Sequence, residues 1–363
     1  MNLRKIAIAA LVVALAGCES FDDDDPRKPA ELVDFEATIE IDKMWSHNIG
    51  DQQEYLSPLR IVEDAGVVYA ASIDGTVEAY NRNSGEVKWS IELEAPISGG
   101  VSASRGMVLV GTTEGEVIAL SAVDGSERWR AQLRTEITAP PVSNGRQVVI
   151  NSPEGIVYAL SATDGSELWQ YQDVLPALTS QGIAAPVMEG PIALVGFASG
   201  KLSALRADAG LPVWEALVAI PTGRSDIEKI VDVDGEPTVS GPSVFAATIN
   251  GNIKAFDLRQ GRVLWEAPAS TSNALASGFS NVYLSELDGT VTAYRADTGA
   301  QVWRNEQLSY RGLSAPVVWS SYLAIGDRDG YVHVLSQVDG SFVARYKIGD
   351  TVRSLMASRG KSL

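Results

Sequence analysis

The sequence predicts an all-β fold, an eight-bladed β-propeller built from four-stranded antiparallel blades. Two observations predict it. A pair of glycines at a fixed spacing, here called the ruler, recurs in seven units, and in the segment between the two glycines of each unit apolar residues occupy alternate positions. In every unit a second glycine follows the first by ten residues, and a Trp follows the second glycine by four in six of the seven units. The first glycines are Gly75, Gly115, Gly155, Gly200, Gly251, Gly289 and Gly330. The closing residues are Trp89, Trp129, Trp169, Trp214, Trp265, Trp303 and, in the last unit, Ala344.

Each unit divides into four strands joined by turns. Asn-Gly and Asp-Gly pairs supply the positive φ angles of tight hairpins, and four antiparallel strands every forty or so residues are typical of a propeller blade. Large aromatic side chains bury the most area, so we expect the repeated Trp to wedge between blades and not to contact a ligand. The elements expected in residues 140–170 are an inner strand from Pro141, a turn at Asn144-Gly145, a strand from Gln147 to Asn151, a strand from Gly155 to Ser161, a turn at Asp164-Gly165 and a strand with Trp169.

The two ends of the repeat are expected to form the eighth blade together. Trp45 lies 44 residues before Trp89, so Ile39–Ser46 is predicted to be a fourth strand with no unit before it. At the other end, Val352–Ala357 is predicted to be an inner strand, and Lys361–Leu363 the start of a second one. A ring closed in this way would protect its strand edges. Because the last strands are missing or unfinished, we expect this blade to be incomplete at the C-terminus, and weak or open.

The first residues predict export. Arg4 and Lys5 precede an apolar run, Ile6–Ala16, that is shorter than the roughly 20 residues needed to span a bilayer. The run ends in Leu-Ala-Gly-Cys18, which resembles the lipobox of bacterial lipoproteins, in which the Cys becomes the lipid-modified (acylated, for example palmitoylated) N-terminus. An ordinary export signal with an incidental Cys is the alternative. The resemblance implies a signal peptide at 1–17, a lipidated tether at 18–37 and a propeller at 38–363, anchored at the periplasmic face of the outer membrane because no Asp follows Cys18.

Composition excludes several classes of function. The formal charge is −17, whereas phosphate binding needs clustered Lys and Arg, so we expect no nucleic acid partner. A single Cys and two His residues leave too few ligands for a disulfide framework or a Cys-rich or His-based metal site. We therefore expect no metal and no cofactor.

The connections between units are where a partner is expected. The proline of the next inner strand follows the closing Trp by 17 residues at Trp169 and by 23 residues at Trp214. It follows by only 12 residues at Trp129 and 13 at Trp303. Connections of this type all emerge on one face, so the two long ones are predicted to form one patch, and binding commonly resides in such loops. The second contains the run 224–234, with room for a short helical turn. The alternative is that both loops pack only for their own stability.

Together, the lipobox, the ruler and the run from Arg224 to Asp234 resemble the BamB family, lipoprotein subunits of the bacterial outer-membrane β-barrel assembly machinery. The resemblance implies a scaffold that binds periplasmic domains of the barrel-inserting subunit and assists insertion of nascent outer-membrane proteins. It assigns partner binding to Leu178, Ser180, Gln181, Asp232 and Asp234. In physical terms, Leu178 would be an exposed apolar anchor, and the two Asp residues would accept hydrogen bonds from basic groups. Family members often have an apolar residue in place of Ser180 and Arg in place of Gln181, so this loop is expected to bind differently.

An enzyme is the main alternative, because quinone-dependent periplasmic dehydrogenases use similar blades. Those enzymes resemble one another in a vicinal Cys pair and a bound calcium, and Cys18 leaves no Cys for the body of this chain. The sequence contains no nucleophile elbow and no phosphate loop, so we predict no catalytic residue. A third possibility is a scaffold that pairs a client strand with an exposed sheet edge.

Overall fold

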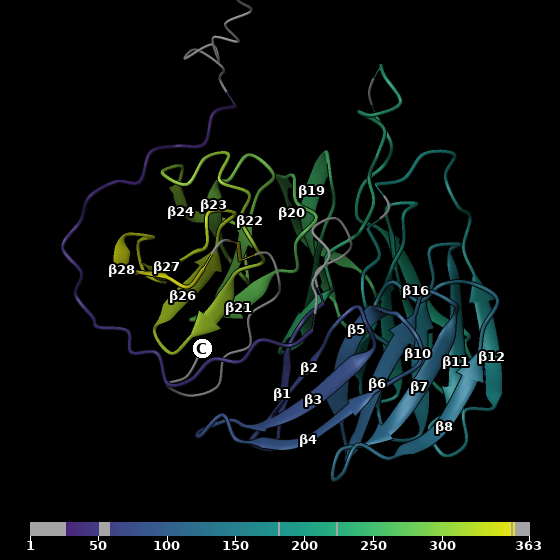
Figure 1. Ribbon diagram of the computed structural model, residues 1–363. Coiled ribbons are helices and arrows are strands. Elements are labelled where there is room, and N and C mark those ends of the chain that lie inside the picture. The colour runs from purple at the N-terminus through teal and green to yellow at the C-terminus, as the bar shows by residue number, and fades with distance from the viewer. Residues whose placement is uncertain (1–26, 51–58, 181, 223, 350, 353–363) are drawn as a thin grey trace, which may run out of the picture.

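The computed structural model describes residues 27–50, 59–180, 182–222, 224–349 and 351–352, and within them it contains strands but no helix. The strands form seven four-stranded sheets, in each of which successive strands pair antiparallel (Figure 1). Blades 1 to 4 are β1–β4 (Val62–Asp64, Val67–Ala71, Thr76–Asn81, Val87–Glu92), β5–β8 (Ile97–Ser104, Met107–Thr112, Glu116–Ser121, Glu127–Gln132), β9–β12 (Val142–Ser143, Gln147–Asn151, Ile156–Ser161, Glu167–Gln172) and β13–β16 (Val187–Glu189, Ile192–Gly196, Lys201–Arg206, Pro212–Leu217). Blades 5 to 7 are β17–β20 (Thr238–Ser240, Ser243–Ala247, Gly251–Asp257, Val263–Ala269), β21–β24 (Ala276–Gly278, Asn281–Ser285, Val291–Arg295, Gln301–Asn305) and β25–β28 (Val317–Trp319, Tyr322–Gly326, Tyr331–Ser336, Phe342–Lys347).

The prediction of eight blades is wrong, because the described residues form seven. Residues 39–46, expected to be the fourth strand of an eighth blade, form no strand. A fourth strand needs a third strand beside it, and the residues at 353–363 that were expected to begin the other half of that blade lie outside the described residues. The one described residue of the predicted inner strand, Val352, donates its N–H to the carbonyl of Asp327 at 2.9 Å, as Val233 does to Phe197 at 3.2 Å.

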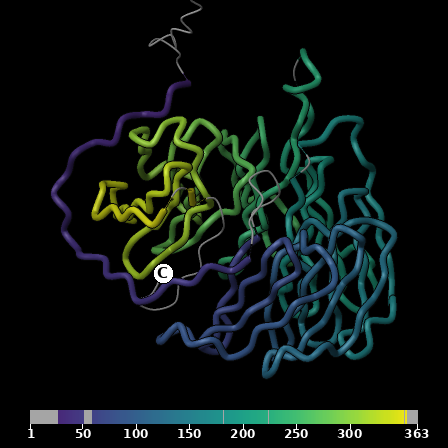
Figure 2. Tube along the Cα trace, in the orientation of Figure 1, coloured from purple at the N-terminus to yellow at the C-terminus, as the bar shows by residue number. Residues whose placement is uncertain are grey.

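The N-terminal segment instead forms a strap, defined here as residues 30–45, along the outside of blade 7 (Figure 2). The N–H of Thr38 donates to the carbonyl of Val343 in β28 at 2.9 Å, and Ile39 and Ile41 pack against the apolar core of blade 7. At its end the strap reaches blade 1, where the indole of Trp45 donates to the carbonyl of Arg82 at 2.8 Å. The strap therefore contacts both the last blade and the first.

Buried charges hold the start of the strap on blade 7. Arg311 donates to the carbonyl of Ala30 at 2.9 Å and to the buried carboxylate of Asp327 at 2.7 Å. Burial alone would raise the pKa of Asp327, but the bonds from His333, the Tyr331 N–H and Arg311 hold that pKa at about 2. Burial lowers the pKa of His333 despite its contact with Asp327, so the ring is neutral at pH 7.

Each repeated Trp wedges between neighbouring blades, as predicted. Trp129 in β8 donates its indole N–H to the carbonyl of Ala162 in blade 3 at 3.0 Å, and its ring covers Gly165. A Cβ on Gly165 would lie 2.6 Å from the ring, and φ at this residue is +74°, so only glycine fits both the turn and the ring. The other pairs are Trp45 with Gly85, Trp89 with Gly125, Trp169 with Gly210, Trp214 with Gly261, Trp265 with Gly299, and Trp303 with Gly340.

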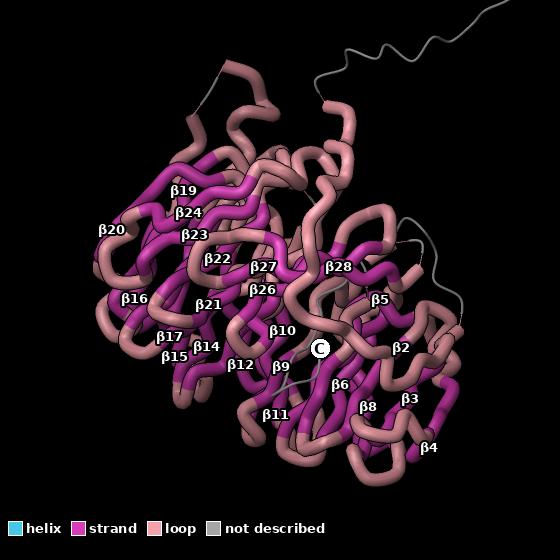
Figure 3. The backbone as a smooth tube through the Cα atoms, turned by 90° about the vertical axis from the view of Figure 1, so that its left-hand side faces the viewer, coloured by secondary structure: helices cyan, strands magenta, loops and turns pink. Residues whose placement is uncertain are grey.

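Connections from the fourth strand of one blade to the first of the next lie on one side of the ring, here called the loop face. The connection at 218–237 stands well above the ends of the strands in two perpendicular views (Figures 1 and 3). The strap begins at the same side, since the Ala30 N–H donates to the carbonyl of Ser309, in the connection between blades 6 and 7, at 2.9 Å. The loop face thus carries both long connections and the start of the strap.

Two glycine substitutions distinguish the contribution of the Trp–Gly contact to stability from that of the turn conformation. Gly165→Ala and Gly190→Ala both put Ala at a positive φ, +74° and +57°, but a Cβ at Gly190 meets nothing within 4 Å. We expect the strained backbone to lower the free energy of unfolding of each variant by about 1–2 kcal/mol. In Gly165→Ala, overpacking against Trp129 should lower it by about 1–3 kcal/mol more. Urea unfolding of both variants measures the difference, and equal losses would show that the Trp–Gly contact is loose.

Candidate partner-binding site

The two long connections are neighbours on the loop face. Residues 173–186 join β12 to β13, and residues 218–237 join β16 to β17, so both flank blade 4. Their sequences meet directly, through side chains separated by more than fifty positions in the chain. The prediction that they form one patch is confirmed.

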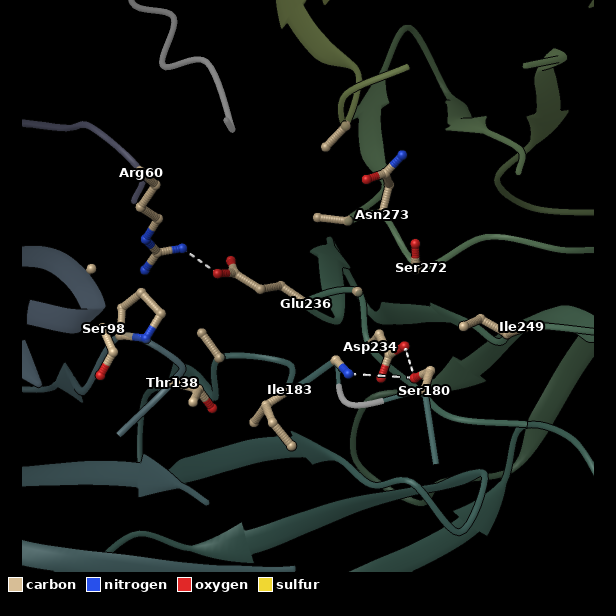
Figure 4. Close-up of a pocket in the computed structure, with 17 residues that line it drawn as sticks. Arg60, Ser98, Thr138, Ser180, Ile183, Asp234, Glu236, Ile249, Ser272 and Asn273 are labelled. Atoms are coloured by element: carbon tan, nitrogen blue, oxygen red, sulfur yellow. Dashed lines mark hydrogen bonds and ion pairs between the residues drawn. The ribbon is translucent and has the colours of Figure 1, made fainter. Parts of the chain in front are cut away.

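Ser180 joins the two connections, and its contacts with Asp232 and Asp234 are here called the joint. Its backbone N–H and its hydroxyl Oγ lie 2.6 and 2.8 Å from the same carboxylate oxygen, Oδ2 of Asp232. The hydroxyl also contacts Oδ2 of Asp234 (Figure 4). Because a hydroxyl carries one hydrogen, Ser180 can donate to one carboxylate only, and the second contact is a hydrogen bond when Asp234 is protonated.

Burial dominates the electrostatics of this joint. It raises the pKa of Asp232, whose side chain is completely buried, although the two bonds from Ser180 oppose the rise. It raises the pKa of Asp234 to about 6; the Ser180 bond opposes this, and the charge of Asp232 adds to it. Oδ1 of Asp232 has no hydrogen-bond partner among the described residues. The joint therefore favours a proton or another positive charge near Asp234.

Apolar side chains occupy the outer parts of both connections. Leu178 is 46% exposed and Ile227 is 70% exposed. The segment at 224–230 is a series of turns rather than a helix, stabilised by the carboxylate of Glu228, which accepts the N–H groups of Arg224 and Ser225. From the β18–β19 turn, Asn250 donates to the carbonyl of Ile227 at 3.0 Å, so blade 5 supports this tip.

The structure places the predicted partner-binding residues at different depths. Leu178 is exposed, Ser180 and Asp234 are partly buried, and Asp232 is buried. Gln181 and the predicted lipidation site Cys18 lie outside the described residues. Asp232 was expected to accept hydrogen bonds from a partner. Instead, one of its carboxylate oxygens accepts hydrogen bonds from Ser180, and neither oxygen is in contact with solvent.

A cavity of about 410 Å³ opens beside this joint, at the centre of the ring, and sequence reasoning missed it. Residues before or within the first strand of every blade line it, and an ion pair between Arg60 of blade 1 and Glu236 of blade 5 crosses it (Figure 4). Its polar lining residues are Arg60, Ser98, Thr138, Ser180, Asp234, Glu236, Ser272 and Asn273. No sequence signal marks Arg60, which lies two positions before the start of β1, whereas Glu236 lies within the long connection.

The described residues contain neither a metal-binding cluster nor a membrane-spanning helix. No group of three or more His, Cys, Asp or Glu side chains is arranged there to hold a metal ion. In the same residues, no helix is long and apolar enough to cross a membrane.

The raised pKa of Asp234 predicts a pH effect on stability. Between about pH 4 and 6 the folded chain binds this proton more tightly than the unfolded chain, so the free energy of unfolding falls as pH rises through that range. The fall attributable to Asp234 is about 2–3 kcal/mol, complete by pH 7. Asp234→Asn should remove it.

The measurement is urea unfolding of the wild type and Asp234→Asn at pH 4, 5, 6 and 7. Taking the difference between the two proteins cancels groups such as Asp327, whose lowered pKa acts at lower pH and with the opposite sign. A difference that stays constant from pH 4 to 7 would contradict the assignment.

Comparison with known proteins connects this architecture to one family. The family model described as outer membrane protein assembly factor BamB matches residues 73–305 and 280–360. The outer membrane protein assembly factor BamB of Pseudomonas aeruginosa is 49% identical over 352 residues, covering 96% of this chain and 92% of that protein. The Escherichia coli K12 protein of the same name is 34% identical over 362 residues, with 96% and 92% covered.

Solved structures agree with this result. The crystal structure of BamB from Moraxella catarrhalis superposes with a TM-score of 0.78 at 32% identity, covering 82% of this chain and 90% of that one. A europium-containing methanol dehydrogenase superposes with a TM-score of 0.68 at 14% identity, a likeness that shows the fold alone. The chain belongs to the family of outer membrane protein assembly factor BamB.

Proposed function

We propose that this protein is a lipid-anchored scaffold of the outer-membrane protein assembly complex, and that its loop face binds periplasmic domains of the barrel-inserting subunit. Membership of the BamB family supports the role in outer membrane protein assembly. The observation that carries the binding site is the joint at Ser180, because it fixes two separate connections into one surface. Two loops held together present less flexible contacts than two loops that move independently, which lowers the entropy cost of binding.

The apolar tips supply the contact area in this proposal. Burying a side chain such as Leu178 or Ile227 against a partner contributes about 1.5–3 kcal/mol, and exposed apolar residues grouped on one face are typical of protein interfaces. The buried Asp232 acts beneath them as a positioning residue that holds Ser180 and, through it, the loop that carries Leu178. Asp234, at the edge of the cavity, remains available to a basic group.

The proposed role needs no chemical step. A scaffold acts by holding partners in register, and the long connections on a rigid ring are suited to that task. We therefore propose that the protein is not an enzyme and that its relationship to quinone-dependent dehydrogenases is limited to the shared fold.

Substitutions at the tips test the binding surface. We expect Leu178→Ala combined with Ile227→Ala to weaken binding of the purified barrel-inserting subunit about 30- to 1,000-fold, because each truncation of a central apolar contact costs about 1–2 kcal/mol. The control is Val338→Ala, which truncates a side chain that is 76% exposed in the β27–β28 turn, on the opposite side of the ring. Biolayer interferometry measures both. Unchanged affinity of the double variant would refute the surface, as would an equal loss in the control.

Replacement of Cys18 tests the anchor. If Cys18 carries the lipid, Cys18→Ala should move the protein from the outer-membrane fraction to the soluble periplasmic fraction, because acyl chains contribute about 0.8 kcal/mol for each buried methylene. The fractionation is done in cells depleted of the barrel-inserting subunit, so that binding to this partner does not hold the variant on the membrane. A variant that still sediments with outer membranes under these conditions would contradict the proposal.

A further inference from the structure

We infer that the strap has an acid-operated release, in which a second proton on the ring of His333 displaces Arg345 and frees residues 33–38 from blade 7. Figure 2 shows this part of the strap along the outside of the blade. The release is a property of the folded chain alone and depends on neither the lipid anchor nor the partner proposed above.

The two ring nitrogens of His333 have different partners, and these partners fix its tautomer. Nε2 lies 2.9 Å from Oδ2 of Asp327, and Nδ1 lies 3.2 Å from Nε of Arg345. Because the Nε of an arginine can only donate, Nδ1 is the acceptor, and the hydrogen of the neutral ring is on Nε2, where it donates to Asp327. A second proton can be placed only on Nδ1, where it would face the N–H of Arg345.

Arg345, in β28, connects His333 to the strap. Its Nη1 donates to the carbonyl of Val33 at 3.1 Å, and its guanidinium carbon lies 5.0 Å from the ring centre of Phe35. Phe35 in turn stacks on Phe342 of β28, with ring centres 5.3 Å apart. Val33 and Phe35 therefore stay on the blade only while the guanidinium keeps its place.

The charges around His333 disfavour another cation. The titratable and charged groups on the elements packed here are Asp327 and Asp329 in the β26–β27 turn, Tyr331 in β27, Arg311 in the connection from β24 to β25, Arg345 in β28 and Asp34 in the strap. Asp329 and Asp34 are exposed, so water screens their charges. At the ring itself, two arginines face one buried carboxylate, that of Asp327. A charged His333 would make three cations against one anion.

The pKa of His333 agrees with this arrangement. Burial lowers this pKa from the ordinary value of 6.5, the two arginines lower it further, and Asp327 opposes the change. Release of the strap admits water to the ring, which returns the pKa towards its ordinary value. The released form therefore binds the proton more tightly than the attached form, and attachment weakens as pH falls below about 6.5.

Release would uncover a sheet edge. β28 is the outermost strand of blade 7, and the carbonyl of Val343 in it accepts the N–H of Thr38 at 2.9 Å. Without this segment, that carbonyl loses its donor, and the ring of Phe342 loses the aromatic partner that covers it. Acid would thus convert a covered edge strand into an open one.

Hydrogen exchange of the strap measures the release. Protection of the Thr38 amide is followed by mass spectrometry in the purified full-length protein at pH 7.5, 6.5 and 5.5, with each rate divided by that of the unfolded sequence at the same pH. We expect protection to fall about five- to tenfold from pH 7.5 to 5.5, because attachment weakens by up to about tenfold for each pH unit below 6.5. Protection of β6 is the internal control and should not change. A strap with constant protection would overturn the inference.

Two histidine variants locate the proton. His333→Gln keeps a donor for Asp327 and an acceptor for Arg345 but takes up no proton, so its protection should be equal at pH 7.5 and 5.5. His47→Gln is the matched control, because His47 is the other histidine of the chain and lies at blade 1, with Nε2 2.7 Å from the carbonyl of Gly85. It should keep the pH dependence of the wild type. A pH dependence that survives in His333→Gln, or disappears in His47→Gln, would refute the assignment to His333.

The imidazole nitrogens of the wild type give an independent measurement. With 15N-labelled histidine, the ring signals of two residues are seen by NMR, and His47→Gln identifies those of His333. We expect the Nε2–H tautomer at pH 7.5 and a protonation midpoint that coincides with the loss of Thr38 protection. An Nδ1–H tautomer at pH 7.5, or protonation without loss of protection, would contradict the mechanism.

Two further variants separate the link from other titrating groups. Arg345→Gln removes the guanidinium that holds Val33, so protection of Thr38 should be low at every pH; protection equal to that of the wild type would refute Arg345 as the link. Asp234→Asn removes a carboxyl whose pKa of about 6 lies in the same range, and the pH dependence should remain. Its loss in Asp234→Asn would assign the effect to the cavity and overturn the release at His333.

Discussion

The architecture depends on the contact between a Trp of one blade and a glycine of the next. The indole ring covers a glycine that has a positive φ, and the indole N–H satisfies a backbone carbonyl beside it, as Trp129 does at Gly165 and Ala162. This contact combines burial of a large aromatic surface with a directional hydrogen bond, so it sets both the spacing and the orientation of neighbouring sheets. Because it recurs around the ring, the connections are not needed to hold the blades together. They are free to differ in length.

That freedom explains why the candidate site lies where it does. Residues 173–186 and 218–237 extend from blades that have the same strand order as their neighbours. Their conformation is maintained from below, by the carboxylate of Asp232 on Ser180 and by Asn250 beneath Ile227. Polar groups are thus buried at the base of the loops, and apolar side chains are exposed at the tips, the reverse of the arrangement within the blades.

The parts of the fold that repeat could be predicted from the sequence, and the parts that occur once could not. Glycine spacing located all seven blades, and the wedge role of the Trp residues followed from their regular position. The prediction of an eighth blade was wrong because Trp45 makes the same contact, with Gly85, without belonging to a strand. A wedge needs only one side chain, whereas a strand needs a neighbour along its length.

Loop lengths alone predicted that the two long connections are neighbours. The burial of Asp232 was not predicted, since its depth is set by Ser180, 52 residues away. The cavity at the centre of the ring was not predicted either, because it is formed by residues that all seven blades contribute.

The strap has a mechanical consequence. It meets the last blade through Arg311 and Thr38 and the first blade through Trp45, so the two ends of the ring share one length of chain. Tension applied at the N-terminal side would be borne first by the Ala30 contacts with Ser309 and Arg311 on the loop face. Only after these yielded would the load pass along the strap to the seam between blades 7 and 1. A tethered molecule built in this way would resist a pull at its attachment point before the circle of sheets itself was strained.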